Sequence, residues 1–591
     1  MEIITNTGER FDVTSGYNFD FEFINPLLSD VGSQSAPGTL PYTPRNLRLL
    51  EFPDRIDNVR RPRVKRTVTL REGSFQKIAT QVLLKANPKE RIVTTFYLDE
   101  AIFYERIKTV NMNEVNYGAP RQASVQELFT LCQDVAFKRR TDDFHVFPVI
   151  SNYDINTSSD TLENVILNKV TYNETTGVAS LLDQSLYGIV VDGTPVAVPF
   201  GYGIAPFLKV SFVIRKVAEH FGYTLVNNIF ATDHSLKQLV LVNNVADSIV
   251  KGTLDYARLV PTCTVSEFVK TLQNKFGLRF LANEVARTIT IATLDDRLTL
   301  PPDLDLTPHA TERPRVDWAD KQRLHLSSGT SIPGASPAVN SVDELTRVYG
   351  PVHFAYYSSN PGALEYNTLY YVYSENIFVV KVRMGPGSPP KIKRFSPYFD
   401  YTAPGEGELL DLAAPDEQLP VFRLHYLDPA RGYEMAYLMP GIPETVLVNS
   451  TLVFSDDDKE QAEKKITIPI MFCFSLPSLQ TAMSVPVGTT GAYDESGSGW
   501  GGNLALNYTW TNGIRNRKYV QYDLTLARSN HPVSCLLRLP LPRLQTLDLT
   551  TPKLLFHQPV LIERVKCRVG TGTFEVTETL FRTLKHYEEE A

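Results

Sequence analysis

The sequence contains few of the residues that mark a metal site, a redox centre or a disulfide framework. Its 591 residues include only five cysteines, which are Cys132, Cys263, Cys473, Cys535 and Cys567. No two of them have the spacing of a CxxC redox pair or a zinc ribbon, and their odd number gives no disulfide framework. The ten histidines include no HxH or HExxH pair. We therefore expect no transition-metal site, no cofactor and no structural disulfide.

The sequence also lacks the short motifs of common catalytic sites. It has no Walker A loop to hold a phosphate and no GxSxG to present a nucleophilic serine. The aspartates of Ser455–Glu460 lack the spacing, the central glycine and the final glutamate of an EF-hand, which favours a solvated loop over a calcium site. We therefore expect no enzyme. A glycosidase carboxylate pair is left open, since its members meet only in space. Trp318, Trp500 and Trp510 can stack on sugar, but tryptophans in a β-rich protein more often lie in the core or at an interface.

Charge and hydropathy exclude two further classes of protein. The net charge is −7 and the pI is near 5.9, which argues against nucleic acid as the main partner. The longest apolar runs, such as Ile466–Phe474, are far shorter than a membrane span. The first residues lack the basic and apolar regions of a secretory signal. We therefore expect a soluble chain made in the cytoplasm, or one that is exported without a classical signal.

The sequence is rich in residues and patterns that favour β-strands. Tyrosine (28 residues) and phenylalanine (31 residues) are frequent, and Val/Ile/Thr runs alternate with turn residues. We expect a mainly β, α+β fold of several β-barrel or sandwich domains with a few inserted amphipathic helices. At about 150 residues per domain the length suggests about four domains. The expected division is an N-terminal β domain (1–120), an α+β segment (121–205), a helix–strand domain (206–300), a β domain with long Pro/Gly loops (301–430) and a C-terminal β domain (431–591).

Several elements can be placed within these regions. Lys65–Lys85 predicts two strands around a Glu72-Gly73 turn, and Arg91–Leu98 predicts a third strand. Apolar residues at helical spacing predict a helix in Asp99–Val110, and Ser124 with Glu127 forms a capping box at the start of another. After Pro301 we expect almost no helix. The last hundred residues, including Tyr519–Ala527, alternate like strands.

Two segments of the centre resemble each other at an offset of 55 residues. Val213–Asn228 and Phe268–Asn283 each read as an amphipathic helix, a Phe-Gly pair and a short strand. Gly222 and Gly277 fit the position after a helix end, where a left-handed backbone is needed. Thr264 and Glu267 form a capping box for the second helix. The pair is either an internal duplication or two unrelated units with a common connection.

Three stretches carry a family likeness. They are Asn25–Arg55, His220–Asp296 and His531–Val569. Together they resemble the baseplate hub and tail-associated proteins of tailed bacteriophages and prophages, particularly those of Bacteroides-type hosts. A β-rich chain with many prolines, no signal peptide and no disulfide framework also has the profile of a virion component, which assembles in the host cytoplasm and leaves by lysis.

The resemblance implies a structural role without catalysis. It implies a homotrimeric ring at the virion tail tip, with paired β-barrel domains in each subunit that match a hexameric tail tube. The expected partners are other copies of this chain, tail tube and distal tail proteins, and fibre or spike proteins. DNA would pass through the assembly without specific binding, which an acidic subunit favours, and the chain would not insert stably into a membrane. The alternative function is a cell-surface protein that binds or degrades glycan.

The stretch Ser29–Asn46 is the candidate interface. It has three prolines and no apolar periodicity, and a long structureless loop inside a compact domain is usually functional. One interpretation is an extended arm at 25–60 that reaches a neighbouring subunit, and the other is an ordered surface loop packed on its own domain. The basic run Arg60–Arg66 is either a solvated linker or a docking patch for an acidic surface. The predicted interface residues are Leu40, Pro41, Tyr42, Pro44, Arg45, Arg60, Arg61 and Arg63.

Overall fold

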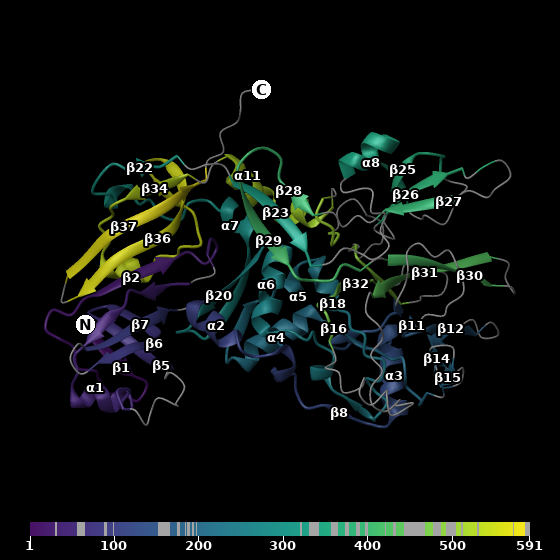
Figure 1. Ribbon diagram of the computed structural model, residues 1–591, viewed down its shortest axis with the longest axis horizontal. Helices are drawn as coiled ribbons and strands as arrows, with labels where there is room; N and C mark the ends of the chain where they lie inside the picture. Colours follow the sequence, from purple (N-terminus) through teal and green to yellow (C-terminus); the bar gives the residue numbers. More distant parts are fainter. Residues whose placement is uncertain are drawn as a thin grey trace.

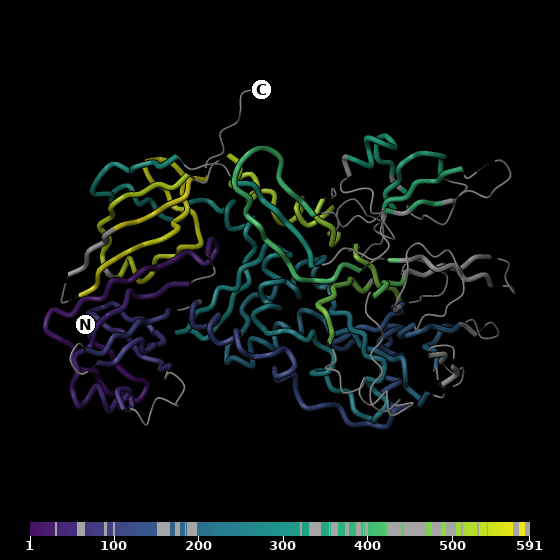
Figure 2. Tube along the Cα trace, in the orientation of Figure 1, coloured from purple at the N-terminus to yellow at the C-terminus, as the bar shows by residue number. Residues whose placement is uncertain are grey.

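The computed structural model describes most of the chain. The described residues are 1–29, 32–55, 65–87, 91–98, 100–151, 166–173, 178–183, 185, 189–191, 194–196, 198–318, 322–329, 342–355, 364–372, 377–383, 385, 391–395, 400–419, 421–428, 433–442, 467–476, 486–491, 504–509, 512–528, 531–570 and 573–584. The fold is mainly β, with several sheets and a smaller number of helices (Figures 1 and 2). This confirms the expected α+β class.

The largest sheet has twelve strands, of which eleven come from the two ends of the chain and one, β22, comes from its middle. Its order is β1-β5-β6-β7-β3-β2-β36-β37-β34-β22, with β4 paired to β7 and β35 paired to β36. The N-terminal strands are β1 (Glu2–Thr5), β2 (Phe19–Ile24), β3 (Gln34–Ser35), β4 (Gly38–Leu40), β5 (Lys65–Glu72), β6 (Phe75–Asn87) and β7 (Arg91–Leu98). The others are β22 (Arg315–Val316), β34 (Pro532–Cys535), β35 (Lys553–Leu555), β36 (Gln558–Gly570) and β37 (Thr573–Thr583).

This sheet differs from the expected division of the chain. Figure 1 shows purple N-terminal strands beside yellow C-terminal strands, and β2 pairs antiparallel with β36 from Phe19 opposite Val569 to Ile24 opposite Arg564. The expected bounds at 120 and 431 place these strands in separate domains, whereas their hydrogen bonds place them in one sheet. The inward positions of β2 are Phe19, Phe21 and Phe23, which are buried in one apolar core with residues of β6, β7 and β36.

A central unit of helices and short strands lies beside this sheet. Its helices are α2 (Glu100–Ile107), α3 (Val125–Ala136), α4 (Val210–His220), α5 (Ile229–Thr232), α6 (Val265–Phe276) and α7 (Leu294–Thr299), with short 3-10 turns at Met112–Glu114, Leu236–Gln238 and Tyr256–Arg258. A further 3-10 turn, Thr307–His309, contacts the segments beside the large sheet. The two predicted capping boxes, at Ser124 and at Thr264, are both formed. Gly277 ends α6 with φ 61°, as predicted.

The two similar segments of the centre contribute to one small sheet. β17 (Thr224–Asn227) follows α4, and β20 (Leu278–Asn283) follows α6. β21 (Thr288–Thr293) lies between them, parallel to β17 and antiparallel to β20. The structure thus brings both helix–glycine–strand units to the same three-stranded sheet.

The remaining strands form smaller sheets around the centre. A five-stranded sheet contains β9 (Phe144–His145), β16 (Phe207–Lys209), β18 (Leu239–Leu241), β32 (Phe472–Leu476) and β33 (Val487–Thr489). A four-stranded sheet contains β10 (Val149–Ser151), β11 (Ile166–Leu167), β30 (Val421–Asp428) and β31 (Tyr433–Ile442). Another contains β24 (His353–Ala355), β25 (Leu369–Val372), β26 (Ile377–Val382) and β27 (Lys391–Phe395). A three-stranded sheet contains β23 (Gln322–Ser328), β28 (Tyr401–Thr402) and β29 (Glu408–Ala414). The two-stranded pairs are β8 (Arg121–Gln122) with β19 (Thr253–Leu254), β12 (Val170–Asn173) with β13 (Val178–Leu181), and β14 (Ile189–Val191) with β15 (Thr194–Val196).

Helices also occur after Pro301, where almost none were expected. They are α8 (Val342–Tyr349), α10 (Ile514–Lys518), α11 (Val520–Arg528) and α12 (Leu541–Gln545). The predicted strand at Tyr519–Ala527 was wrong, because this segment forms α11. The carboxylate of Asp295 accepts hydrogen bonds from the backbone N–H groups of Gln521 and Tyr522, at 3.1 and 3.0 Å. It therefore caps the helix from a distant part of the chain.

Candidate functional site

Five of the eight predicted interface residues lie within the described part of the chain, in and just after β4. Leu40 is fully buried in the core of the large sheet, where it lies opposite Ile92 of β7. Its side chain supports the fold and is not available to a neighbouring subunit. The Tyr42 hydroxyl donates a hydrogen bond to Asp54, and Arg45 forms an ion pair with Asp12 at 3.5 Å. Arg60, Arg61 and Arg63 lie outside the described residues.

The segment after Leu40 turns into a short helix, α1 (Pro44–Leu49), which was not expected. Pro44 occupies the first turn, where its missing N–H costs nothing. The Thr43 hydroxyl caps the helix by accepting from Asn46 N at 3.2 Å. The buried Asn46 side chain donates to the carbonyl oxygens of Pro41 and Asp12, both at 2.9 Å. These contacts match the second interpretation of the stretch, an ordered segment packed on its own domain.

Residues 32–40, which we call the seam segment, join the two halves of the large sheet. β3 is only two residues long, and it lies between β2 and β7. Serine hydroxyl groups supply hydrogen bonds to the neighbouring strands that the backbone of so short a strand lacks. Ser33 Oγ accepts from Ile24 N of β2 at 3.0 Å, and Ser35 Oγ accepts from Phe96 N of β7 at 3.0 Å. A buried backbone N–H without a partner is costly, so both hydroxyls stabilise the closure.

A buried asparagine forms hydrogen bonds between the N-terminal and C-terminal parts of the chain. The side-chain nitrogen of Asn25 donates to Leu549 O at 2.6 Å and to Ile562 O at 2.7 Å, and its backbone N–H donates to Glu563 O at 2.9 Å. Asn25 is fully buried. Nothing in the local sequence indicated this role, because both acceptors lie more than 500 residues away.

The three stretches that carry the family likeness meet in space. Asn25–Arg55 and His531–Val569 share the large sheet through β2 and β36. Leu27 of the first stretch and Leu561 of the last are buried in the same apolar cluster as Phe268 and Phe280 of the central stretch. Arg279 of the central stretch also donates to Leu27 O at 3.3 Å. One contiguous part of the molecule therefore contains all three.

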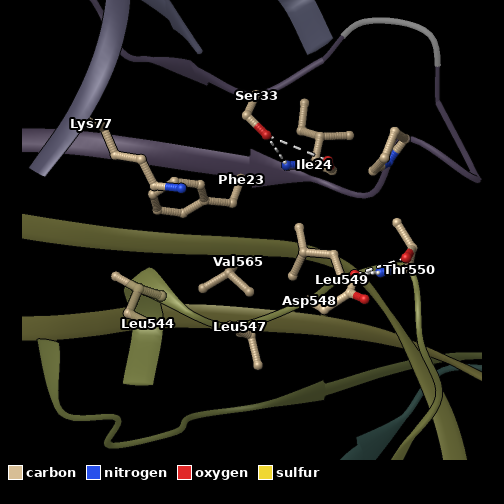
Figure 3. Close-up of a pocket in the computed structure, with 11 residues that line it drawn as sticks. Phe23, Ile24, Ser33, Lys77, Leu544, Leu547, Asp548, Leu549, Thr550 and Val565 are labelled. Carbon is tan, nitrogen blue, oxygen red and sulfur yellow. Dashed lines mark hydrogen bonds between the residues drawn. The ribbon is translucent and has the colours of Figure 1, made fainter. Parts of the chain in front are cut away.

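A cavity of about 130 Å³ lies where the chain ends meet (Figure 3). Its apolar wall comes from β2, β36 and α12 with the residues that follow it, namely Phe23, Val565, Leu544 and Leu547. Lys77 and Asp548 are its charged lining residues. Pockets for substrates or cofactors usually enclose about 300–1,000 Å³. This cavity is therefore a packing gap beneath α12 and too small for such a ligand.

A larger groove of about 710 Å³ crosses the outer face of the large sheet at β2, β3, β7 and β36. Ion pairs on this face join Asp20 to Arg568 at 2.7 Å and Glu22 to Arg564 at 3.2 Å. The charged groups that β2 and β36 present are thus already paired within the chain. The groove has room for a ligand, but it presents no excess charge that would bind one.

A buried polar cluster in the central unit has the residue types of a serine nucleophile site. Ser328 Oγ lies 3.0 Å from Lys275 Nζ and 2.9 Å from both Asp416 and the Tyr508 hydroxyl. Lys275 and Asp416 form an ion pair at 3.0 Å, and their side chains are 1% and 3% exposed. An ammonium paired with a carboxylate has no lone pair with which to take the serine proton. The cluster therefore supports packing of α6 against β23 and does not activate Ser328.

The described residues offer little other chemistry. They contain no group of three or more His, Cys, Asp or Glu side chains placed to hold a metal ion. All five cysteines are free thiols, and burial raises the pKa of Cys132, Cys263 and Cys567 to about 12. A thiol with so high a pKa supplies almost no thiolate at neutral pH, so these cysteines are poor nucleophiles. No helix in the described part of the chain is long and apolar enough to cross a membrane.

An exposed aromatic side chain lies at the edge of the large sheet. Of the three tryptophans, Trp318 is the one within the described residues, and it is 80% exposed. Its ring packs edge-on against His531 with the ring centres 5.0 Å apart. Val316 of the edge strand β22 is 44% exposed. The period-two spacing of Val316 and Trp318 is the sequence signal that could have identified this edge.

Comparison with known proteins adds no family. No protein-family model matches the chain, and no curated protein matches it in sequence.

Proposed function

We propose that the chain is a structural subunit of a phage tail tip, a baseplate hub that forms a homotrimeric ring. In this proposal the ring caps the tail tube, connects it to distal tail and fibre or spike proteins, and lets DNA pass without binding it specifically. The protein would be located in the virion, at the tail tip, after assembly in the bacterial host cytoplasm.

The observation that carries the proposal is the convergence of the three resembling stretches. They are far apart in the sequence, yet they form one contiguous unit through β2, β36 and the central core. Stretches that resemble one family and serve one function are expected to form one module. Independent chance likenesses would have no reason to meet in space.

Two further features support a structural role. The buried Lys275–Asp416 pair and the high-pKa cysteines are unsuited to nucleophilic catalysis. The overall charge of −7 suits a subunit that must let DNA pass, because anionic surfaces repel phosphate.

Pro41, Tyr42, Pro44 and Arg45 remain proposed ring contacts. The Arg45 side chain is 52% exposed, so it can reach a neighbouring subunit while keeping its ion pair with Asp12. Leu40 is removed from this set because it is buried.

Solution mass and particle images test the proposal. The purified chain should assemble, alone or with the tail tube protein, into particles with three-fold symmetry in negative-stain images, and light scattering should give a mass of three subunits or a multiple of three. A protein that never shows three-fold particles and instead retains or cleaves polysaccharide would contradict the proposal. It would favour the glycan-directed alternative, for which the exposed Trp318 would be the first residue to test.

A further inference from the structure

The two outer edges of the large sheet are treated differently. The edge at β1 is covered by the chain itself, since Phe11 N donates to Ile3 O at 3.0 Å and Thr5 N donates to Glu9 O at 2.8 Å. The edge at β22 ends the sheet, and the described part of the chain places no strand beyond it. Figure 1 shows β22 at the periphery of the molecule. Short length, charged side chains and proline limit which strands can pair with an edge. This edge is two residues long and has Pro314 and Arg315, but it also carries the exposed Val316 and Trp318.

The apolar face of the sheet continues to this open edge. Val316 lies opposite Val533 of β34, and Val533 is only 4% exposed within the core of the sheet. The two side chains of a cross-strand pair share a face. Trp318, two residues further on, extends the same face and packs on His531. Val316 and Trp318 are exposed because the edge strand has no neighbour, and not because they point away from the core face.

The hydrogen-bond pattern shows which backbone groups are free for pairing. Asp317 N donates to Pro532 O at 2.9 Å, so the backbone of Asp317 faces β34. Backbone groups alternate in direction along a strand. The N–H and C=O groups of Val316 and Trp318 therefore face the open edge, where they can pair with another strand.

We propose that the β22 edge pairs with the β22 edge of a second copy of this chain, antiparallel and centred on Val316. In this register Val316 lies opposite Val316 of the second copy as a doubly hydrogen-bonded pair. By symmetry, Arg315 of each copy then lies opposite Asp317 of the other copy, which gives two such pairs. Trp318 lies opposite Pro314 of the second copy. The N–H of Trp318 can donate to the carbonyl oxygen of that Pro314, and this bond does not need the N–H group that proline lacks.

Charge complementarity is the reason for choosing a second copy as the occupant. Arg315 and Asp317 share one face and already form an ion pair at 3.1 Å, with side chains 79% and 49% exposed. The antiparallel register converts this pair into a ring of four alternating charges. Registers shifted by two residues toward the N-terminus would instead place Arg313 opposite Arg315, which is repulsive. The strand is thus complementary to its own inverted copy.

This contact is two-fold, so it is separate from the three-fold contacts of the proposed ring and does not depend on them. Symmetric contacts of this kind use the same patch on both copies. The pairing would extend the twelve-stranded sheet across two molecules and would bury both copies of Trp318, the residue type most enriched among energetically dominant interface positions.

Site-specific crosslinking tests the register. In the Val316→Cys variant the two introduced thiols would face each other across a pair whose Cα atoms are about 5.5 Å apart, so a short bis-maleimide reagent should give a covalent dimer. The matched control is Glu312→Cys, whose two copies would lie about 25 Å apart in the same register. The unmodified chain controls for its own five cysteines. Equal crosslinking of all three proteins, or of none, would overturn the proposal.

A charge-swap series provides a second, independent test of the same register. Arg315→Asp and Asp317→Arg should each weaken the dimer about tenfold by analytical ultracentrifugation, because each reverses two cross-strand pairs. The double variant R315D/D317R should restore the affinity of the unmodified chain. Trp318→Ala should weaken it about 30-fold or more. Failure of the double variant to restore affinity would also overturn the proposal.

The outcomes separate this inference from the proposed function. Three-fold particles from the Val316→Cys variant without a specific crosslink would leave the tail-tip function standing and reject the edge pairing. A specific crosslink in a protein that never forms three-fold particles would support the edge pairing and reject the tail-tip function.

Discussion

The seam segment and the β22 edge segment, Arg315 to Trp318, differ in how their composition relates to their exposure in the fold. The proline-rich N-terminal stretch looked like an arm for a neighbouring subunit, yet it closes the large sheet with Leu40 fully buried. The later segment drew attention only to Trp318, yet it forms an open sheet edge with that residue 80% exposed. The difference shows that irregular composition does not identify an interface. Two strands of two residues each differ in this way: β3, with its hydroxyl side chains, is core structure, whereas β22 is a surface strand with no further neighbour among the described strands.

Deleting residues 37–45 is the strongest test of whether the seam segment belongs to the core of the sheet. The deletion removes β4 and Leu40 together with the Thr43 cap of α1. We expect the large sheet not to form stably, because the deletion removes the β4–β7 pairing and the fully buried Leu40, although β3 is retained. Circular dichroism and solubility of the purified variant measure this. A variant that folds and melts like the unmodified chain would restore the arm interpretation.

A smaller change tests the burial of the seam segment directly. Leu40→Ala should lower the free energy of unfolding by about 2–5 kcal/mol, the usual cost of such a truncation in a packed core. Trp318→Ala is the matched control from the exposed edge, and at concentrations that keep the chain monomeric it should change stability by less than about 0.5 kcal/mol. Denaturant titration of both variants gives the comparison, and similar losses for the two would remove the distinction between the segments.

The hydroxyl groups of the seam segment can be tested one at a time. Ser35→Ala leaves the buried Phe96 N–H without its acceptor and should cost about 1–3 kcal/mol. Thr39→Ala, at a half-buried position of β4 in the same segment, should cost clearly less. Hydrogen exchange at the Phe96 amide should accelerate in the serine variant alone. Unchanged exchange there would show that the serine does not hold the strands together.

The smallest effect is expected at a tight turn beside the segment that leads to β22. Phe556 and His557 occupy the two-residue hairpin loop between β35 and β36, with φ 47° and 64°. Such turns favour Asn-Gly, because left-handed backbone strains larger residues. Replacing the pair with Asn-Gly should raise the stability by about 1 kcal/mol, measured as a higher Tm. Gly73→Ala, at φ 56° in the β5–β6 turn, should lower it by a similar amount.

Local signals in the sequence predicted the elements whose causes are local. The Glu72-Gly73 turn, the two capping boxes and the end of α6 at Gly277 each depend on residues a few positions apart, and all are present. The helix α11 was missed for the opposite reason. Its residues Val520, Tyr522, Leu524 and Leu526 alternate like a strand, but Tyr519, Tyr522, Asp523 and Leu526 are buried at helical spacing. The cap that favours the helix comes from Asp295.

The candidate sites were harder to predict because they are made by pairing between distant strands. Neither Asn25 nor Ser35 belongs to a motif, and each has its role only once its distant partner strand is in place. The open edge at β22 is likewise defined by the absence of a neighbour among the described strands, which no single segment of sequence can encode. The interface roles of Pro41, Tyr42, Pro44 and Arg45 stay predictions.

The pairing of β2 with β36 has a consequence for how the protein is made. Asn25 and its acceptor Ile562 are 537 residues apart, so at about 5–20 residues per second the ribosome needs roughly 30–110 s between them. During that time the strands β1 to β7 have emerged, but β2 has no C-terminal partner and its apolar face is incomplete. The nascent chain therefore carries an unfinished sheet until its last strands appear, and chaperone binding to the first hundred residues should decide how much of the protein reaches its final fold.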